Sequence, residues 1–237
     1  MSEKYLKRIR ETFPDLAITS VEENRDGVAN DVVIVNRAKT FGFGKQEWSN
    51  GLYPREASIV GLLSQHVDLQ LPVVEAIFDD FALTTYVPGE PLYRSDLLAL
   101  DDETQDALAH QLADFLRQMH GIPIDVLAAH DIPTSATNRD RDAWLDILKE
   151  IEQDVVPHLT SYQKGRVERL FRPLVEGRID FKYSPALVHG DLLPKHILYD
   201  SEKQRINGII DFGESGLGDP ASDFADVLYE LGEGFFE

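Results

Sequence analysis

The chain has 237 residues, of which 43% are hydrophobic, so it is long and apolar enough to build a core as one large domain or two lobes. It has no cysteine, which excludes a disulfide scaffold and a thiolate metal site, and no apolar run reaches the length of a membrane span. Its formal charge of −19 argues against a nucleic-acid partner and favours a cationic small molecule, with solubility alone as the alternative. We therefore expect a cytoplasmic protein with no membrane partner, and the composition indicates no particular oligomeric state.

The first part of the chain predicts a short basic helix followed by a small sheet. The helix is expected at residues 1–10, and strands are expected at 16–21, 32–35 and 40–43. Between the first two strands lies a turn-rich stretch around Gly27. A glycine there could let the backbone cover a phosphate group, and an ordinary hairpin turn is the alternative.

A helix and a hairpin follow. The helix is expected at residues 54–66, with Pro54 in its first turn and an apolar stripe on one side. The hairpin is expected to pair residues 71–78 with 81–86. Pro88 and Gly89 then turn the chain, which predicts a boundary between two lobes.

The middle of the chain predicts three helices. The first starts at about residue 101, with Asp102 as its cap, and ends before Gly121. The second spans about 140–153, and the third starts at Ser161, which we expect to cap it. The second and third helices are expected to bury these residues: Trp144, Leu145, Leu148, Ile151, Val167, Leu170, Phe171 and Leu174.

The strongest signal lies in residues 187–223, which read LVHGDLLPKHILYD and, after a polar turn, INGIIDFGESGLGDPASDF. A hairpin between the two apolar runs would bring Asp191, His196 and Asp211 to one edge of a small sheet. Phosphoryl transfer needs a carboxylate to orient the attacking hydroxyl and oxygen-rich ligands for Mg²⁺. Asp191 suits the first role, and Asp211 with His196 suits the second.

These motifs resemble those of the aminoglycoside phosphotransferase family of antibiotic kinases. In that family the first motif is usually HGD, four spacers and Asn, and His196 stands at the Asn position. The same exchange occurs in the branch that acts on the 2″ hydroxyl of aminoglycosides and in macrolide phosphotransferases. The segments YVPGEPL and FLRQMHGIP also resemble the family.

The resemblance implies roles for further residues. The family places a phosphate-binding lysine at the position of Gly42. Either Lys45 or Lys39 would replace it, or the phosphates would be held without that lysine, and Glu56 matches its glutamate partner. The purine ring would bond to the backbone near Thr85, Tyr86 and Val87. Three residues complete the implied site: Glu214 near the substrate, and His189 and Asp223 behind the catalytic loop.

The implied fold is α+β and bilobal, like the protein kinases, with a nucleotide-binding lobe at 1–86 and a catalytic, substrate-binding lobe at 87–237 that could be truncated at its C-terminus. The implied activity moves the γ-phosphate of ATP or GTP to an aminoglycoside hydroxyl, with Mg²⁺, and confers resistance. The open alternatives are a kinase for macrolides or another small alcohol, a nucleotide-binding pseudokinase, and a metal-dependent hydrolase built on His189, Asp191, His196 and Asp211.

Overall fold

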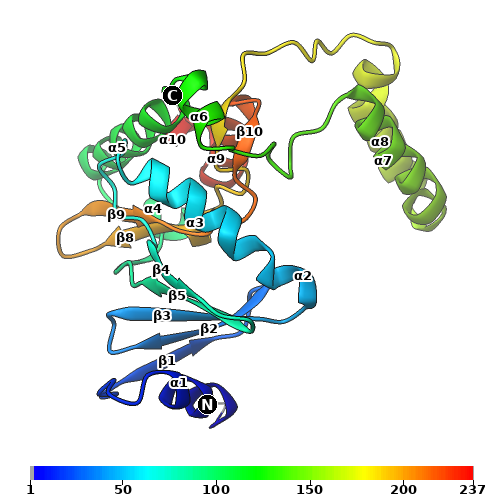
Figure 1. The fold of residues 1–237 in the computed structure, drawn as a ribbon. Coiled ribbons are helices and arrows are strands. Elements are labelled where there is room, and N and C mark those ends of the chain that lie inside the picture. The colour runs from blue at the N-terminus through cyan, green and yellow to red at the C-terminus, as the bar shows by residue number, and fades with distance from the viewer. Residues whose placement is uncertain (1–2, 237) are drawn as a thin grey trace. The chain divides into compact units, whose positions relative to one another are not determined.

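The computed structural model describes residues 3–236 (Figure 1). Its N-terminal part is a five-stranded antiparallel sheet in the order β1-β2-β3-β5-β4. The strands are β1 (Val21–Asn24), β2 (Asn30–Val35), β3 (Lys39–Gly44), β4 (Val74–Ile77) and β5 (Phe81–Thr85).

One face of this sheet packs on helix α1 (Glu3–Thr12). Leu6 and Ile9 of the helix are buried with Phe41, Phe43 and Phe81 of the strands. Because successive side chains of a strand point to opposite faces, Gly42 between the two phenylalanines belongs to the other face. That face is the side of helix α3 (Leu52–Leu63), which follows the short helix α2 (Glu47–Asn50).

The rest of the first compact unit is largely helical. Its helices are α4 (Arg94–Leu97), α5 (Asp102–His120), α6 (Ile124–Ala129), a 3-10 turn (Pro194–His196), α9 (Ala221–Leu231) and α10 (Glu233–Phe236). Its strands are β6 (Glu90–Pro91), β8 (Ile197–Asp200) and β9 (Arg205–Ile209) in one sheet, and β7 (Ala186–Val188) with β10 (Gly216–Gly218) in another.

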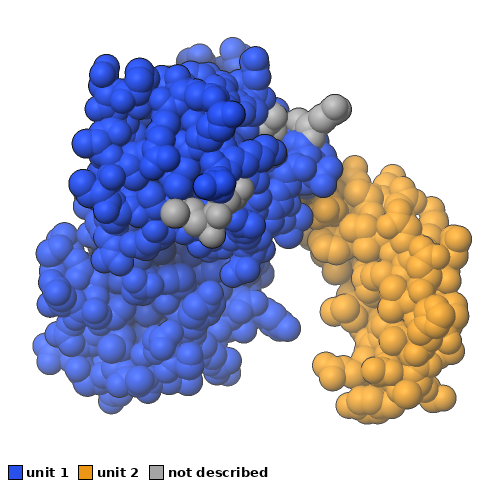
Figure 2. Space-filling model, turned by 90° about the horizontal axis from the view of Figure 1, so that it is seen from below, with its two compact units in different colours: residues 1–136, 185–237 blue, residues 137–184 orange. Residues whose placement is uncertain are grey.

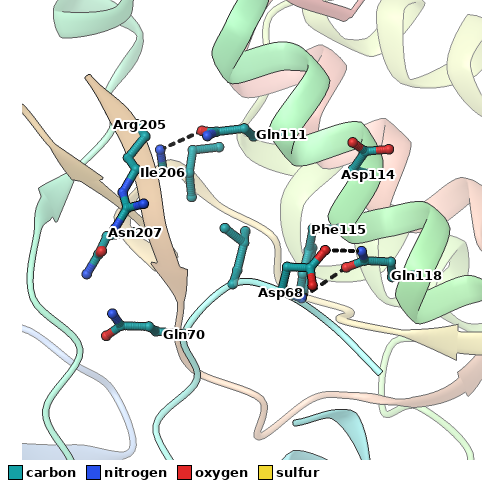
Figure 3. A pocket seen from close by; sticks show the side chains of 10 residues that line it. Asp68, Gln70, Gln111, Asp114, Phe115, Gln118, Arg205, Ile206 and Asn207 are labelled. Carbon is teal, nitrogen blue, oxygen red and sulfur yellow. Dashed lines mark hydrogen bonds between the residues drawn. The ribbon is translucent and has the colours of Figure 1, made fainter. Parts of the chain in front are cut away.

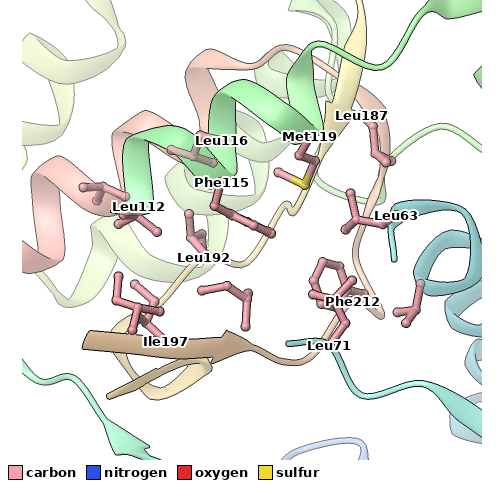
Figure 4. Close-up of a cluster of buried hydrophobic side chains, with 14 of the residues drawn as sticks. Leu63, Leu71, Leu112, Phe115, Leu116, Met119, Leu187, Leu192, Ile197 and Phe212 are labelled. Atoms are coloured by element: carbon pink, nitrogen blue, oxygen red, sulfur yellow. The ribbon is translucent and has the colours of Figure 1, made fainter. Parts of the chain in front are cut away.

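A single hydrophobic cluster joins these elements to α3 (Figure 4). Leu63 of α3 and Leu71 meet Phe115 and Met119 of α5 and Phe212 in this cluster. Burying a large apolar side chain contributes roughly 1.5–3 kcal/mol. The cluster therefore packs against both motifs of the segment 187–223 and stabilises their positions.

The link between α3 and β4 is fixed to strand β9. The Gln70 amide donates to the Asn207 carbonyl (3.1 Å), and the Ile209 amide donates to the Gln70 carbonyl (3.0 Å). A Cβ at Gly208 would lie 2.4 Å from the Gln70 carbonyl oxygen and 2.5 Å from Val87 Cγ1. The close approach of these two segments to β9 therefore requires glycine at position 208.

Residues 137–184 form a second compact unit (Figure 2, orange). It contains α7 (Arg141–Glu150), a π-helical turn (Ile151–Val155), a 3-10 turn (Val156–His158) and α8 (Ser161–Val175). Leu148 and Leu174 are buried, whereas Leu170 is 72% exposed and Trp144 is 38% exposed. The predicted inward faces of these two helices are thus wrong at Leu170 and Trp144.

Most predicted elements are confirmed, including the α+β class, but three further local predictions are wrong. Residues 16–20 form no strand, and β1 begins only at Val21. Helix α5 is capped by Asp101, whose carboxylate accepts from the Thr104 amide, and not by Asp102. Helix α8 is capped by Thr160 in a capping box with Gln163, and not by Ser161. In residues 3–236 no helix has the length and apolarity needed to cross a membrane.

Candidate active site

The loop after β7 is held by a buried carboxylate from α9. Asp223 accepts hydrogen bonds from the backbone amides of His189 (3.0 Å) and Gly190 (2.9 Å), and it is fully buried. His120 of α5 lies behind it, with Nε2 2.9 Å from Asp223 Oδ2. A carboxylate bonded to two amides fixes a loop because buried backbone donors need partners. This contact determines where Asp191 is presented.

A second carboxylate of α9, one helical turn later, holds the same loop. Asp226 Oδ2 accepts from the Leu192 amide at 3.1 Å. Burial raises the pKa of Asp226, and the nearby charges of Asp223 and Asp191 raise it further, against the effect of the Leu192 amide. The sequence interpretation missed Asp226, although its spacing of three from Asp223 places both on one helix face.

His189 is a buried part of this framework. Its Nε2 lies 3.1 Å from the Ile210 carbonyl, which is an acceptor only, so Nε2 carries the proton. Its Nδ1 then accepts from the Asp191 amide (3.2 Å). Burial lowers the pKa of His189, so the ring is neutral near pH 7. His189 thereby links the Asp191 loop to the strand that leads to Asp211.

The hairpin of β8 and β9 brings the three predicted side chains together. His196 Nε2 lies 3.1 Å from Asp211 Oδ2, and His196 Nδ1 lies 2.7 Å from the Asp191 carbonyl oxygen. One ligand atom from each of Asp191, His196 and Asp211 falls within 4.8 Å of the others. Asp211 has a φ of 69°, a left-handed conformation that is uncommon outside glycine and often marks a functional position.

The ionisation of this group follows from its contacts. Burial alone would lower the pKa of His196, but the hydrogen bond and charge of Asp211 raise it above its ordinary value. Partial loss of hydration would raise the pKa of Asp211, yet the hydrogen bond from His196 brings it below its ordinary value. The pair is therefore arranged to carry opposite charges when no metal competes for the imidazole nitrogen.

The same three residues fit a divalent cation. Two carboxylates and one imidazole offer hard oxygen ligands and one nitrogen ligand. His196 Nδ1 faces a carbonyl and so holds the ring proton, which leaves Nε2 toward Asp211 as the ligand atom. The side chain of Asp211 is 57% exposed and that of Asp191 is 34% exposed. The site is thus open to further ligands such as phosphate oxygens or water.

Glu56 of α3 lies beside this group, and in the described part of the chain it has no lysine partner. Burial, followed by the charge of Asp211, raises the pKa of Glu56 to about 7, while a backbone hydrogen bond from Phe212 acts in the opposite direction. On β3, Gly42 offers no side chain, and a Cβ there would lie 3.2 Å from the Tyr53 hydroxyl. That hydroxyl is 2.7 Å from the Gly42 carbonyl and 2.9 Å from Asn30 Oδ1. Tyr53 therefore fills the space beside Gly42.

The two lysines expected to compensate are engaged elsewhere. Lys45 Nζ donates to the carbonyls of Arg25 (2.7 Å) and Gly27 (2.5 Å) and lies 3.3 Å from Asp31 Oδ1. Lys39 Nζ lies 2.5 Å from Glu75. Lys45 therefore braces the turn that contains Gly27, and neither lysine pairs with Glu56.

The segment expected to hold a purine ring leaves one free amide. The Thr85 amide donates to Val73 (2.9 Å), and the Tyr86 amide donates to Ala38 (3.2 Å). Among the described residues, the Val87 amide has no protein acceptor. Its side chain is buried against Gly208. Of the three predicted residues, Val87 thus offers a backbone donor to a ligand.

Two further residues complete the surroundings of Asp211. The carbonyl of Glu214 accepts from Ser135 Oγ at 2.8 Å, so its backbone is fixed three residues after Asp211. Arg55, which precedes Glu56 in α3, also binds this segment through Ser215. The sequence interpretation missed Arg55, because its partners are backbone carbonyls that leave no mark in the sequence.

A pocket of about 260 Å³ lies apart from these residues (Figure 3). Its polar side chains bind each other or the backbone: Gln118 Nε2 donates to Asp68 (2.5 Å), and Gln111 accepts from the Ile206 amide (2.8 Å). None of Asp191, His196 and Asp211 lines it. The acidic and imidazole cluster is therefore the better candidate for the chemistry.

Comparison with known protein families decides the affiliation. The model of the phosphotransferase enzyme family APH matches residues 20–237. The chain belongs to this family. The kinase-like fold expected from the motifs is thereby confirmed, together with the resemblance itself.

The similarity of this phosphotransferase-family chain extends to individual proteins. It is 25% identical to the viomycin phosphotransferase of Streptomyces vinaceus over 155 residues, which is 65% of this chain and 51% of that protein. The GDP complex of aminoglycoside 2'-phosphotransferase-IIIa matches with a TM-score of 0.85 and 27% identity over 98% of this chain and 79% of that chain. A GDP and kanamycin complex of an APH(2″) enzyme matches with a TM-score of 0.82 and 27% identity over 99% of this chain and 80% of that chain. The chain thus spans about half the length of the curated relative.

Proposed function

We propose that this chain is an aminoglycoside O-phosphotransferase, which moves the γ-phosphate of a nucleoside triphosphate to a hydroxyl of a cationic aminoglycoside. The observation that carries this proposal is the convergence of Asp191, His196 and Asp211 within 4.8 Å on an open loop edge. Phosphoryl transfer is largely positioning plus neutralisation of phosphate charge, which such a cluster can provide.

In this proposal the nucleotide lies between a lobe formed by residues 1–86 and a lobe formed by residues 87–237. The Val87 amide is suited to donate to the purine, and the Gly27 turn, braced by Lys45, is suited to cover the phosphates. ATP and GTP are both candidate donors in this proposal. The GDP complexes among the similar structures support GTP as one donor to be tested.

Asp211 and His196 Nε2 would hold Mg²⁺. That ion supplies charge neutralisation on the β- and γ-phosphates. Asp191 accepts or orients the proton of the substrate hydroxyl, and His189 and Asp223 hold the Asp191 loop for that task. Glu214 lies three residues beyond Asp211 and is a candidate contact for the sugar.

The acceptor class rests on charge and on relatives. A formal charge of −19 suits a polycationic substrate, because acidic surfaces concentrate cations. The kanamycin complex of a similar structure supports the same class. We therefore propose an aminoglycoside as the acceptor and antibiotic resistance as the consequence.

The first prediction concerns Asp191. Replacing Asp191 by Asn is expected to lower kcat by at least about a hundredfold, because the hydroxyl proton loses its acceptor. The measurement is phosphate transfer from ATP and from GTP to kanamycin and gentamicin, with macrolides as rival acceptors. Asp106→Asn, a change of an exposed carboxylate on α5, is the matched control and should keep full activity.

A second candidate function is nucleotide binding without turnover, and Gly42 with Tyr53 in the lysine position favours it. Calorimetry with Mg²⁺ and each nucleotide separates the two functions. Nucleotide binding without transfer to any acceptor, by a folded wild-type chain, would support the binding module and contradict the phosphotransferase.

A further inference from the structure

Helix α3 and the loop after Asp211 face each other with like charges. Glu56 of α3 and Asp211 are close enough to interact electrostatically, and Gly42 contributes no cation between them. Two neighbouring carboxylates repel each other when both are ionised. Glu56 accepts a backbone hydrogen bond from Phe212, and Phe212 shares a hydrophobic cluster with α3, but a cationic contact to this loop has to come from another residue.

Arg55, the residue before Glu56, makes that contact. Its Nε donates to the Ser215 carbonyl at 3.1 Å, and its Nη2 donates to the Ser215 carbonyl and, at 3.0 Å, to the Thr134 carbonyl. These acceptors are 160 and 79 residues away along the chain. A guanidinium group can bind both at once because its donors form a planar fork.

The two segments that Arg55 contacts are also hydrogen-bonded to each other. The Leu217 amide donates to the Pro133 carbonyl (2.8 Å), and the Ser135 amide donates to the Leu217 carbonyl (2.9 Å). A Cβ at Gly216 would lie 2.4 Å from the Pro133 oxygen, so the segments touch without intervening side chains. Arg55 therefore binds one hydrogen-bonded structure, formed by residues 133–135 and 215–217, which begins four residues after Asp211.

We propose that Arg55 is a positioning residue, which holds α3 and Glu56 against the Asp211 loop in place of a lysine from β3. The proposal rests on the phosphotransferase function for its kinetic consequence, whereas its structural content stands on the contacts alone. Arg55 touches neither nucleotide nor acceptor in this role. It acts through the backbone of residues 214–217.

The direct test compares Arg55→Met and Arg55→Lys with wild type. Amide hydrogen exchange at Leu217 is expected to be at least tenfold faster in Arg55→Met, with exchange in α5 unchanged. Arg55→Lys is expected to recover only part of the protection, because one ammonium cannot reproduce the planar fork. With kanamycin as acceptor, kcat should fall at least tenfold while KM for the nucleotide changes less than threefold.

Arg117→Met is the matched control. It also removes an arginine from a helix, but Arg117 is exposed and pairs only with Asp114 three residues earlier among the contacts described here. This variant should match wild type in exchange and kcat. If Arg55→Met behaved like Arg117→Met in both measurements, the proposal would be overturned. If Arg55→Met does not fold, Arg55→Lys takes its place. Exchange and kcat of Arg55→Lys equal to those of wild type would then overturn the proposal.

A second test restores the lysine. Gly42→Lys alone would collide with Tyr53, so it is combined with Tyr53→Ala to open the space. In that background the introduced ammonium is expected to pair with Glu56, so Arg55→Met is expected to lower kcat less than threefold. An equal loss in both backgrounds would show that Arg55 does not act in place of the lysine.

Failure of the proposed function gives a different result. A wild-type chain that transfers no phosphate would contradict the phosphotransferase, and exchange at Leu217 would still decide the role of Arg55. A wild-type chain that transfers phosphate, with Arg55→Met equal to wild type, would contradict only the role of Arg55.

Discussion

His196 uses its two ring nitrogens for different tasks. Nδ1 donates to the Asp191 carbonyl, and Nε2 faces Asp211, so one imidazole spans the loop that carries the proposed base and the strand end that carries the proposed metal ligand. The more usual amide of the family would offer an oxygen at this place, whereas imidazole offers a nitrogen. In the proposed site the histidine thus gives structural support and a ligand atom together.

Glu56 provides a prediction at this scale. With a folded-state pKa of about 7 against an ordinary value near 4.5, the folded protein keeps a proton on Glu56 that the unfolded chain releases. Stability from this group is therefore present below pH 4.5 and is lost as pH rises toward 7. Glu56→Gln should increase the free energy of unfolding by about 1–2 kcal/mol at pH 8, a figure discounted for partial exposure.

The measurement is urea unfolding of metal-free protein at pH 4.5 and pH 8. The two proteins should be nearly equal at pH 4.5, because Glu56 is then protonated in the folded state. The same difference at both pH values would contradict the assignment and point to packing instead.

At the scale of elements, short-range patterns predicted the hairpin of β8 and β9 because two apolar runs flank a polar turn. The hairpin in turn predicted the convergence of His196 and Asp211. Contacts from side chain to distant backbone, such as those of Arg55, were missed because carbonyl oxygens occur at every residue. The strand expected at 16–21 failed because alternation alone does not supply a pairing partner, and β2 pairs only from Val21 onward.

Gly208 in β9 gives a prediction at the same scale. Gly208→Ala should lower the free energy of unfolding by about 2–4 kcal/mol, because the new methyl group would overlap the Gln70 carbonyl and Val87. Gly61→Ala in α3 is the matched control: nothing lies within 4 Å of its Cβ position, and it should stabilise by up to about 1 kcal/mol. Chemical denaturation measures the free energy of unfolding of both variants. Equal changes in the two variants would show that the chain segments at Gly208 are not tightly packed.

At the scale of the whole molecule, both hydrophobic clusters belong to residues 1–136 and 185–237. Neither contains a residue of the helical unit 137–184, whose apolar side chains include the exposed Leu170 and Tyr162. We therefore expect the first unit to fold by itself. The prediction of two lobes meeting at 86–87 describes a different division, and it stays a prediction.

Replacing residues 138–183 by a linker of about ten glycine and serine residues tests this independence. We expect the shortened chain to unfold in one cooperative transition with its Tm within about 5 °C of that of the first transition in the full chain. Circular dichroism and calorimetry measure it. Loss of cooperativity would show that the helical unit contributes to the core.

The glycine of β9 has a mechanical consequence. Two separate chain segments, one at Gln70 and one at Val87, pack on the same glycine of β9. A rotation of the five-stranded sheet relative to β9 would therefore pivot at Gly208. Val87, which packs directly on Gly208, would then move less than segments that make no contact with β9.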